Sequence, residues 1–476
     1  MDCGRLVRLI GHSGVLLALL ALLGLTCGLR PARAATITVT GDGDTVAVDQ
    51  AVTLREAVVS INSGSAVNTD VVASGTYGVN DTINFKLPLP ALIKLTSNAV
   101  LPILSDVTIV GPTSGVVAVD GNLATQVFSN PGSVLSIKSL TIQNGKITGN
   151  GGGIYNNGTL NLTNCVVSGN TASQDGGGIY NDGSGAATLI NSTLSGNTAT
   201  AGLGGGIYNN GTIVALTNCT FGNNTAGTDG GGVWNNGEML SVTGTTFSDN
   251  KAPNGCGGGL FNGVPEVTVT NCTFSGNSAS LGGGLCNQSE MTMANCTLSG
   301  NSASSLGGGI FNSDELTIIN TIAANSTAGA DCFNNGTITN DHNLIETDSG
   351  SGNQCSDGTH GDIIGSDPRL APLGHYGGPT ETFALCTAPG VPAPSCTGPS
   401  PAIDAGTDTV VGPPLNLTTD QRGLRRLFGL HVDIGSFEVQ PLHEPAPALS
   451  TMALLFLAVL LGAFGWLRSG VRRTLR

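Results

Sequence analysis

Gly151–Asp175 reads "GGGIYNNGTLNLTNCVVSGNTASQD": three glycines, two apolar or aromatic residues, Asn, and then a run of β-forming residues. The arrangement occurs seven times, with Gly triplets that begin at residues 151, 176, 204, 230, 257, 282 and 307. A regular spacing of 25 to 28 residues indicates stacked structural repeats. Because "TLNLTN" alternates with period two and no helical period appears, each repeat is predicted to consist of strands.

One strand–turn–strand–turn circuit of this length matches one coil of a right-handed parallel β-helix. Each strand then pairs with its equivalent one coil away, about 4.8 Å along the axis. We therefore predict an all-β solenoid of about eleven coils, whose less regular first coils precede residue 151. The exception is "AVTLREAVVSINSG", which has helical character from Thr53 to Ile61 and is predicted to cap the N-terminal end of the solenoid.

Stacking places equivalent residues of successive coils in columns. One predicted inward column is apolar and contains Val167, Leu194, Phe221, Phe247, Phe274 and Leu298. A second column, a structural Asn ladder, contains Asn170, Asn197, Asn224, Asn250, Asn277 and Asn301. We expect these Asn residues at turns, where Asn tolerates left-handed geometry and its amide bonds the neighbours above and below.

The Gly triplets predict one tight corner of each coil, where the backbone has positive φ or approaches a neighbour closely. The candidate corner residues are the third glycines, Gly153, Gly178, Gly206, Gly232, Gly259, Gly284 and Gly309. A phosphate-binding loop is not indicated, because neither Lys-Ser/Thr nor a helix follows.

Ten of the twelve cysteines lie after the predicted signal peptide. Cys332 with Cys355, and Cys386 with Cys396, enclose loops with little core of their own and are candidate disulfides. Cys165, Cys219, Cys272 and Cys296 share one column. Cys272 and Cys296 lie on adjacent coils, so that a disulfide there stays open beside the favoured interpretation of buried thiols.

Both ends carry transport signals. Residues 1–34 contain Arg5 and Arg8, a short apolar core and "RPARA", which predicts a secretory signal peptide cleaved between Ala34 and Ala35. Residues 449–467 form an uncharged apolar run followed by four Arg residues, which predicts a transmembrane helix with a cytoplasmic tail. The predicted parts are the signal peptide (1–34), the N-terminal cap and first coils (35–150), seven Gly-triplet coils (151–331), C-terminal coils and cap (332–440), and the anchor with its linker and tail (441–476).

The exported body is strongly acidic. Between Ala35 and Leu467 the chain has 10 basic and 31 acidic residues, a formal charge near −21. Such a charge argues against DNA, RNA or anionic lipid surfaces as partners and favours solubility. We expect no cofactor; calcium stays open as an alternative, although "GDGD" at Gly41–Asp44 lacks the remaining ligands of a calcium loop.

At this point the chain resembles known bacterial surface proteins. "VTLREAV" (Val52–Val58) resembles the motif of CSLREAI-domain proteins, and the "GGGI" and "FSGN" elements are similar to repeats of chlamydial polymorphic outer membrane proteins. "GSDPRLAPLGHYGGPTETFAL", "SPAIDAG", "TDQRG" and "DIGSFE" resemble the choice-of-anchor Q domain. The last 33 residues are similar to PEP-CTERM or IPTL-CTERM sorting tails. The resemblance implies a right-handed β-helix displayed through a C-terminal sorting anchor.

Candidate catalytic residues are few. Gly151–Asp331 contains one basic residue, Lys251, and no His, so a cleft for an acidic polysaccharide is hard to build there. Asp175 and Asp229 occupy the same turn two coils apart, which is compatible with an inverting acid–base pair, but turn-forming Asp is the favoured interpretation. The densest charged set contains Asp404, Asp420, Arg422, Arg425, Arg426, Asp433 and Glu438. It is interpreted as ion pairing across a terminal cap, with a site as the alternative.

We therefore predict a non-catalytic, exported protein at the cell surface or outer membrane, which acts as an adhesin or scaffold. Its expected partners are a glycan, a host cell or a matrix ligand, with membrane contact through the C-terminal helix and no nucleic acid. The alternative is a polysaccharide lyase or hydrolase on the same fold, because function depends on the site and not on the fold.

Overall fold

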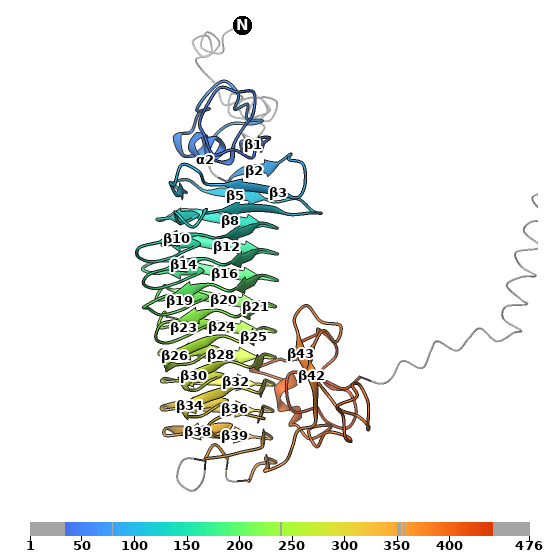
Figure 1. Cartoon of the computed structure of the whole chain (residues 1–476). Coiled ribbons are helices and arrows are strands. Elements are labelled where there is room, and N and C mark those ends of the chain that lie inside the picture. The colour runs from blue at the N-terminus through green and yellow to red at the C-terminus, as the bar shows by residue number, and fades with distance from the viewer. Residues whose placement is uncertain (1–33, 79, 239, 350–353, 357, 441–476) are drawn as a thin grey trace, which may run out of the picture. The chain divides into compact units, whose positions relative to one another are not determined.

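The computed structural model describes residues 34–440 except 79, 239, 350–353 and 357 (Figure 1). The chain divides into two compact units, Met1–Glu438 and Val439–Arg476. The predicted signal sequence before Ala34 and the apolar run 449–467 lie outside the described residues. Within the described ranges, no helix is long and apolar enough to cross a membrane.

The first unit contains the predicted right-handed parallel β-helix, with about ten turns where about eleven were expected (Figure 1). Between Phe128 and Leu306, seven coils each pass through four short strands that belong to four sheets, here numbered in the order in which the chain meets them after a Gly triplet. The coils that the structure describes before and after them contribute no strand to the fourth sheet. Pairing between coils is parallel and in register, as in Ile154↔Ile179 and Leu160↔Ala187. Each sheet therefore consists of equivalent segments of successive coils.

The strands of sheet 1 and sheet 2, in spatial order, have the following bounds. Sheet 1 contains β38 (Cys332–Asn334), β35 (Ile310–Asn312), β31 (Leu285–Asn287), β27 (Leu260–Asn262), β23 (Val233–Asn235), β19 (Ile207–Asn209), β15 (Ile179–Asn181), β11 (Ile154–Asn156), β7 (Phe128–Asn130) and β4 (Leu101–Pro102). Sheet 2 contains β1 (Thr36–Val39), β2 (Asp81–Phe85), β5 (Val107–Val110), β8 (Val134–Lys138), β12 (Thr159–Thr163), β16 (Ala186–Ile190), β20 (Ile213–Thr217), β24 (Leu240–Thr243), β28 (Val267–Thr270), β32 (Met291–Ala294), β36 (Glu315–Ile319) and β39 (Thr337–Asp341).

Sheets 3 and 4 complete the circuit. Sheet 3 contains β3 (Ala91–Lys94), β6 (Val117–Asp120), β9 (Thr141–Gln143), β13 (Val166–Ser168), β17 (Thr193–Ser195), β21 (Thr220–Gly222), β25 (Thr246–Ser248), β29 (Thr273–Ser275), β33 (Thr297–Ser299), β37 (Ile322–Ala324), β40 (Leu344–Ile345) and β41 (Ile363–Ile364). Sheet 4 contains β10 (Lys146–Ile147), β14 (Thr171–Ala172), β18 (Thr198–Ala199), β22 (Thr225–Ala226), β26 (Lys251–Cys256), β30 (Ser278–Leu281) and β34 (Ser302–Leu306).

The core fills the inside of the coils. Every residue of the predicted apolar column from Val167 to Leu298 is completely buried. Its three phenylalanines stack face to face, with ring centroids 5.0 Å apart for Phe221–Phe247 and 4.7 Å apart for Phe247–Phe274. The four cysteines that share a column are buried free thiols, so the alternative disulfide between Cys272 and Cys296 does not form.

The Asn ladder forms a continuous buried chain of amides. Asn197 Nδ2 donates to Asn224 Oδ1 at 2.9 Å, Asn224 Nδ2 donates to Asn250 Oδ1 at 2.9 Å, and the pattern continues to Asn301. The expected left-handed geometry of these Asn residues is wrong. The left-handed conformation belongs instead to the residue before each ladder Asn. This column has φ between 56° and 72° and contains Gly169, Gly196, Asn223, Asp249, Gly276 and Gly300. The turn is thus made by one residue, and the next, with its side chain inside, forms the ladder.

The Gly triplets divide two physical requirements between them. The first glycine of each triplet has positive φ, from 57° to 74°, and fulfils the expected left-handed corner. The third glycine, the predicted corner residue, has no positive φ, but a Cβ on it would lie 2.5 to 2.7 Å from a carbonyl oxygen of the next coil. Close approach of two backbones therefore requires the third glycine.

The predicted N-terminal helix is α2 (Leu54–Ser63), which packs against β1 and β4. Thr53 is its N-cap, and Thr53 and Glu56 form a reciprocal capping box that satisfies two backbone N–H groups. Arg55 forms an ion pair with Asp44, so this carboxylate of "GDGD" already has a cationic partner.

The C-terminal segment differs from the expected end cap. It contains the antiparallel pair β42 (Leu370–Gly374) and β43 (Thr382–Leu385) and the 3₁₀ helix η2 (Asp408–Val411). It lies along the flank of the solenoid, beside sheet 3 (Figure 1). Thr273 Oγ1 donates to Gln421 Oε1 at 2.6 Å, and Asn320 Nδ2 donates to the carbonyl of Thr407 at 3.0 Å. The segment therefore covers the Thr rows of several coils.

Candidate functional site

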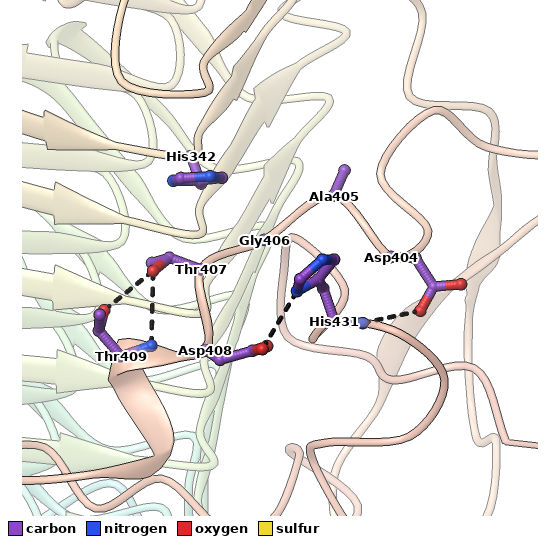
Figure 2. A pocket seen from close by; sticks show the side chains of 8 residues that line it. All are labelled: His342, Asp404, Ala405, Gly406, Thr407, Asp408, Thr409 and His431. Carbon is purple, nitrogen blue, oxygen red and sulfur yellow. Dashed lines mark hydrogen bonds and ion pairs between the residues drawn. The ribbon is translucent and has the colours of Figure 1, made fainter.

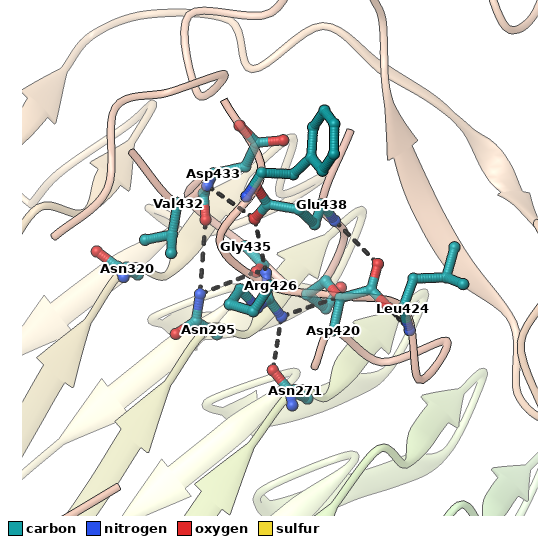
Figure 3. Close-up of polar contacts among 12 residues, drawn as sticks. Asn271, Asn295, Asn320, Asp420, Leu424, Arg426, Val432, Asp433, Gly435 and Glu438 are labelled. Atoms are coloured by element: carbon teal, nitrogen blue, oxygen red, sulfur yellow. Dashed lines mark hydrogen bonds and ion pairs between the residues drawn. The ribbon is translucent and has the colours of Figure 1, made fainter. Parts of the chain in front are cut away.

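The C-terminal charged set is held together by a buried arginine (Figure 3). Arg426 is completely buried; its Nη2 donates to Asn271 Oδ1 at 2.6 Å, and its Nη1 donates to the Gly435 carbonyl at 2.9 Å and lies 3.8 Å from Glu438 Oε2. Because Asn271 belongs to a coil turn, this guanidinium attaches the C-terminal segment to the solenoid. The geometry supports a structural role for the set.

Two neighbouring carboxylates complete this network. Asp420 pairs with Arg422 at 2.6 Å, and the Arg422 guanidinium lies 3.6 Å from the centre of the Phe437 ring. Glu438 accepts the backbone N–H of Asp433 at 3.0 Å. Burial, followed by the charge of Asp433, raises the pKa of Glu438 to about 8. The side chains of Asp420, Arg422 and Glu438 thus contact other residues of the C-terminal segment. Their polar atoms bind within the contact between this segment and the solenoid.

The carboxylates of the repeats act as turn acceptors. Asp175 Oδ1 accepts the backbone N–H of Leu203 at 2.9 Å, and Asp229 Oδ1 accepts that of Cys256 at 2.6 Å. Each carboxylate thus fixes the equivalent turn of the next coil. This is the turn-forming interpretation of the two Asp residues, and their repeated role explains why they recur at one position before a triplet.

A pocket of about 350 Å³ lies where the C-terminal segment meets the last coils (Figure 2). It is lined by His342, Asp404, Ala405, Gly406, Thr407, Asp408, Thr409 and His431. His431 Nδ1 lies 3.1 Å from Asp408 Oδ2; the side chain of His431 is 59% exposed and that of Asp408 is 40% exposed. Asp404 Oδ1 accepts the N–H groups of Leu430 and His431. Among the residues that the structure describes, no group of three or more His, Cys, Asp and Glu is arranged to hold a metal ion.

A larger cleft, which we call the threonine cleft, has a volume of about 600 Å³ and lies between sheet 2 and the segment that follows η2. Its lining residues are Ser241, Thr243, Thr268, Thr270, Thr292, Thr317, Ile319, Thr409, Pro413, Pro414, Leu415 and Leu417. One wall is a row of hydroxyls in register across four coils, and the other consists mostly of Pro and Leu. None of the lining residues is charged. Such a cleft suits an uncharged ligand with both apolar faces and hydroxyl groups.

An aromatic ladder covers the outside of sheet 1, a feature that the sequence motif contains but that we did not assign. Tyr155, Tyr180, Tyr208, Trp234 and Phe261 stack with ring centroids 4.6 to 6.0 Å apart. Because the rings cover one another's faces, a sugar ring meets mainly their edges, and the ladder is better suited to stabilising the coils. Burial raises the pKa of Tyr208 to about 12.

Three disulfides join described residues. Cys332 bonds Cys355 and Cys386 bonds Cys396, at the two candidate pairs. The third, Cys256–Cys286, was not considered from the sequence. Cys286 stands in the aromatic column, and Cys256 precedes the triplet of the adjacent coil. The sequence contains a signal for this disulfide: a Cys stands at a position that is aromatic in other coils, and a second Cys lies one coil away.

Comparison with known proteins supports the repeat. A family model described as the Chlamydia polymorphic membrane protein (Chlamydia_PMP) repeat matches residues 164–182 and 271–288, which occupy the same part of two coils. No curated protein matches the chain. Three chains of solved structures match, among them the crystal structure of pectate lyase Pel9A. That likeness has a TM-score of 0.49 and 12% identity and covers 86% of this chain and 98% of the other; it says nothing about what this chain binds. The chain is therefore a parallel β-helix with coils similar to the Chlamydia polymorphic membrane protein repeat.

Proposed function

We propose that the protein is exported, is displayed at the cell surface or outer membrane, and acts there as a non-catalytic adhesin or scaffold. Three disulfides favour an oxidising compartment outside the cytoplasm. The match to a polymorphic membrane protein repeat supports a surface location. The apolar run 449–467 would provide the membrane anchor.

The threonine cleft is the observation that carries the adhesive role. Its size is within the range of ligand-binding pockets, and its mixture of hydroxyls, Pro and Leu can bind an uncharged glycan through hydrogen bonds and apolar contact. The hydroxyl row repeats with the coil spacing, so a chain of sugar units can meet the same groups more than once. A glycan, free or on a host cell or matrix, is thus the preferred partner. The acidic body disfavours nucleic acid.

Binding of the mature chain in detergent to a glycan array, host cells and matrix proteins tests this role. We expect saturable binding to uncharged glycans, reduced about tenfold by Thr268→Val together with Thr292→Val, because Val keeps the shape but removes the hydroxyl. Thr188→Val is the matched control, since Thr188 belongs to the same row outside the cleft. Absence of binding to all three targets, or equal effects of the variants, would contradict the adhesive role.

The second candidate is a polysaccharide lyase or hydrolase. The pocket around Asp404, Asp408 and His431 favours it, because it gathers partly exposed carboxylates and an imidazole that can transfer protons. Incubation with neutral and acidic polysaccharides would show new reducing or unsaturated ends, and Asp408→Asn would abolish them. No product from any polysaccharide would count against catalysis.

A further inference from the structure

The backbone nitrogen of Ala35, the first residue after the predicted cleavage site, is held by a buried carboxylate. Ala35 N donates to Asp81 Oδ1 at 2.8 Å, and both residues are 0% exposed. On the other side, the Ala35 carbonyl accepts the N–H of Thr82 at 2.8 Å. The strands that follow, β1 and β2, are paired in register, so this nitrogen has a fixed position at the first coil.

Within the part of the chain that the structure describes, the Asp81 carboxylate has no cationic partner. Asp81 Oδ2 accepts the backbone N–H of Gly78 at 3.2 Å, and none of the ion pairs among the described residues includes Asp81. Opposite Asp81, β5 presents Val107. A buried carboxylate with only neutral donors is costly, whereas a cation at hydrogen-bond distance offsets that cost.

Tyr77 is the titratable side chain that interacts with Asp81. Its hydroxyl is buried and interacts with the side chain of Ser60. Burial raises the pKa of Tyr77, and the charge of Asp81 adds to this. The acceptor at the Ala35 nitrogen is thus the Asp81 carboxylate, which can accept a proton of an ammonium group.

We propose that cleavage before Ala35 completes the fold, because the new α-ammonium group of Ala35 forms a buried ion pair with Asp81 that fixes β1 to β2. The inference rests on the proposed export. Hydrolysis of the Ala34–Ala35 amide by a signal peptidase consumes one water; the released segment keeps a carboxylate on Ala34, and Ala35 keeps a protonated amine. In the uncleaved chain the same nitrogen carries no charge, so its first coil opens more readily.

The sign of the pH dependence follows from the charge. An α-amino group has an ordinary pKa of about 7.7 to 8. A nearby opposite charge shifts a pKa by about 1 to 3 units, here upward, and each unit corresponds to a tenfold stabilisation of the paired state. The stabilisation is therefore fully present below about pH 7.7 and is lost as pH rises through the folded-state value.

The test uses the mature chain from Ala35 to Arg476 in detergent, released from a fusion so that Ala35 is the first residue whatever a host would cleave. Competitive acetylation across pH 6 to 11, read by mass spectrometry, gives the α-amino pKa. We expect a value at least about one unit above that of a peptide beginning Ala-Thr-Ile-Thr-Val, and a return to the peptide value in Asp81→Asn. Asp106→Asn, which removes another carboxylate that accepts a backbone N–H, should leave it unchanged.

A second measurement does not depend on the variants. A chain with Gly-Ser-Gly-Ser-Ala34 before Ala35 should exchange the amide hydrogens of Thr36–Val39 about tenfold faster at pH 7 than the mature chain. An α-amino pKa equal to that of the peptide, or equal exchange in both chains, would overturn the ion pair while leaving export untouched. Sequencing of the exported protein that shows no terminus at Ala35 would instead overturn the processing step and the proposed signal peptide together.

Discussion

The third glycine of each triplet provides the sharpest test of how the coils pack. Gly178 has ordinary φ, so a side chain there meets no backbone strain, but a Cβ would lie 2.6 Å from the Gly206 carbonyl oxygen of the next coil. Gly178→Ala therefore isolates the effect of close approach. Gly222 is the matched control, because it also has ordinary φ and a Cβ there would meet its nearest neighbour, Ser248 Oγ, at 3.6 Å.

The size of the effect follows from these distances. The new methyl group would lie about 0.8 Å closer to the Gly206 carbonyl oxygen than an ordinary van der Waals contact allows, so the two coils must separate locally. That movement weakens the bonds from Gly178 N to the Gly205 carbonyl and from Ile179 N to the Gly206 carbonyl, now 3.0 and 2.9 Å long. Overpacking and weakened hydrogen bonds together predict a loss of about 2 to 5 kcal/mol. Gly222→Ala should be neutral or slightly stabilising.

Amide hydrogen exchange by mass spectrometry is the suitable assay, because stacked repeats open locally and a single unfolding midpoint averages over many coils. Peptides that contain β15 and β19 should exchange at least about thirtyfold faster in Gly178→Ala than in the wild type. Gly222→Ala should show no such change. Equal protection in the two variants would refute the explanation of the triplets by close approach.

Three further predictions concern other contacts. Asn224→Leu should cost at least about 3 kcal/mol locally, because it leaves the backbone N–H and the amide of Asn197 without their buried acceptor. Peptides that contain β17 and β21 should then exchange amide hydrogens at least about a hundredfold faster than in the wild type, and unchanged exchange would contradict the ladder. The folded-state pKa of Glu438 is raised to about 8, so the stability that its protonated form contributes is present below about pH 4.5 and is lost as pH rises through about 8. Thermal melts of Glu438→Gln across this pH range should lack the loss. A pH profile of the melting temperature identical to that of the wild type would contradict the prediction. Cys256→Ser with Cys286→Ser removes a link across 30 residues and should lower stability by about 3 to 4 kcal/mol, measured against wild type in denaturant; the wild type in reductant should behave alike.

The structure of one coil can be predicted well from the sequence, because equivalent residues of successive coils stack in columns and each column needs the same kind of residue in every coil. The apolar column and the amide ladder were assigned correctly from position alone. The sequence predicts left-handed geometry one residue too late, because Asn is suited both to a left-handed turn and to an amide ladder. The composition of the columns separates them: the ladder holds Asn in all six coils, whereas the left-handed column mixes Gly, Asn and Asp, as in Gly196, Asn223 and Asp249.

The parts without a period could not be placed in the same way. No repeat relates Gln421 or Arg426 to the coils, so the sequence does not indicate that they contact Thr273 and Asn271 on the flank. The threonine cleft exists only because the segment after η2 lies opposite sheet 2, and its two walls are about 90 to 176 positions apart in the sequence. The candidate site therefore depends on long-range packing that the repeat pattern does not contain.

Surface display is the central claim, and antibody labelling of whole cells tests it most directly. Antibodies against Gly151–Asp331 should bind intact cells as strongly as permeabilised cells, and external protease should remove the signal. Labelling that appears only after permeabilisation would place the β-helix inside the cell and contradict its role at the surface.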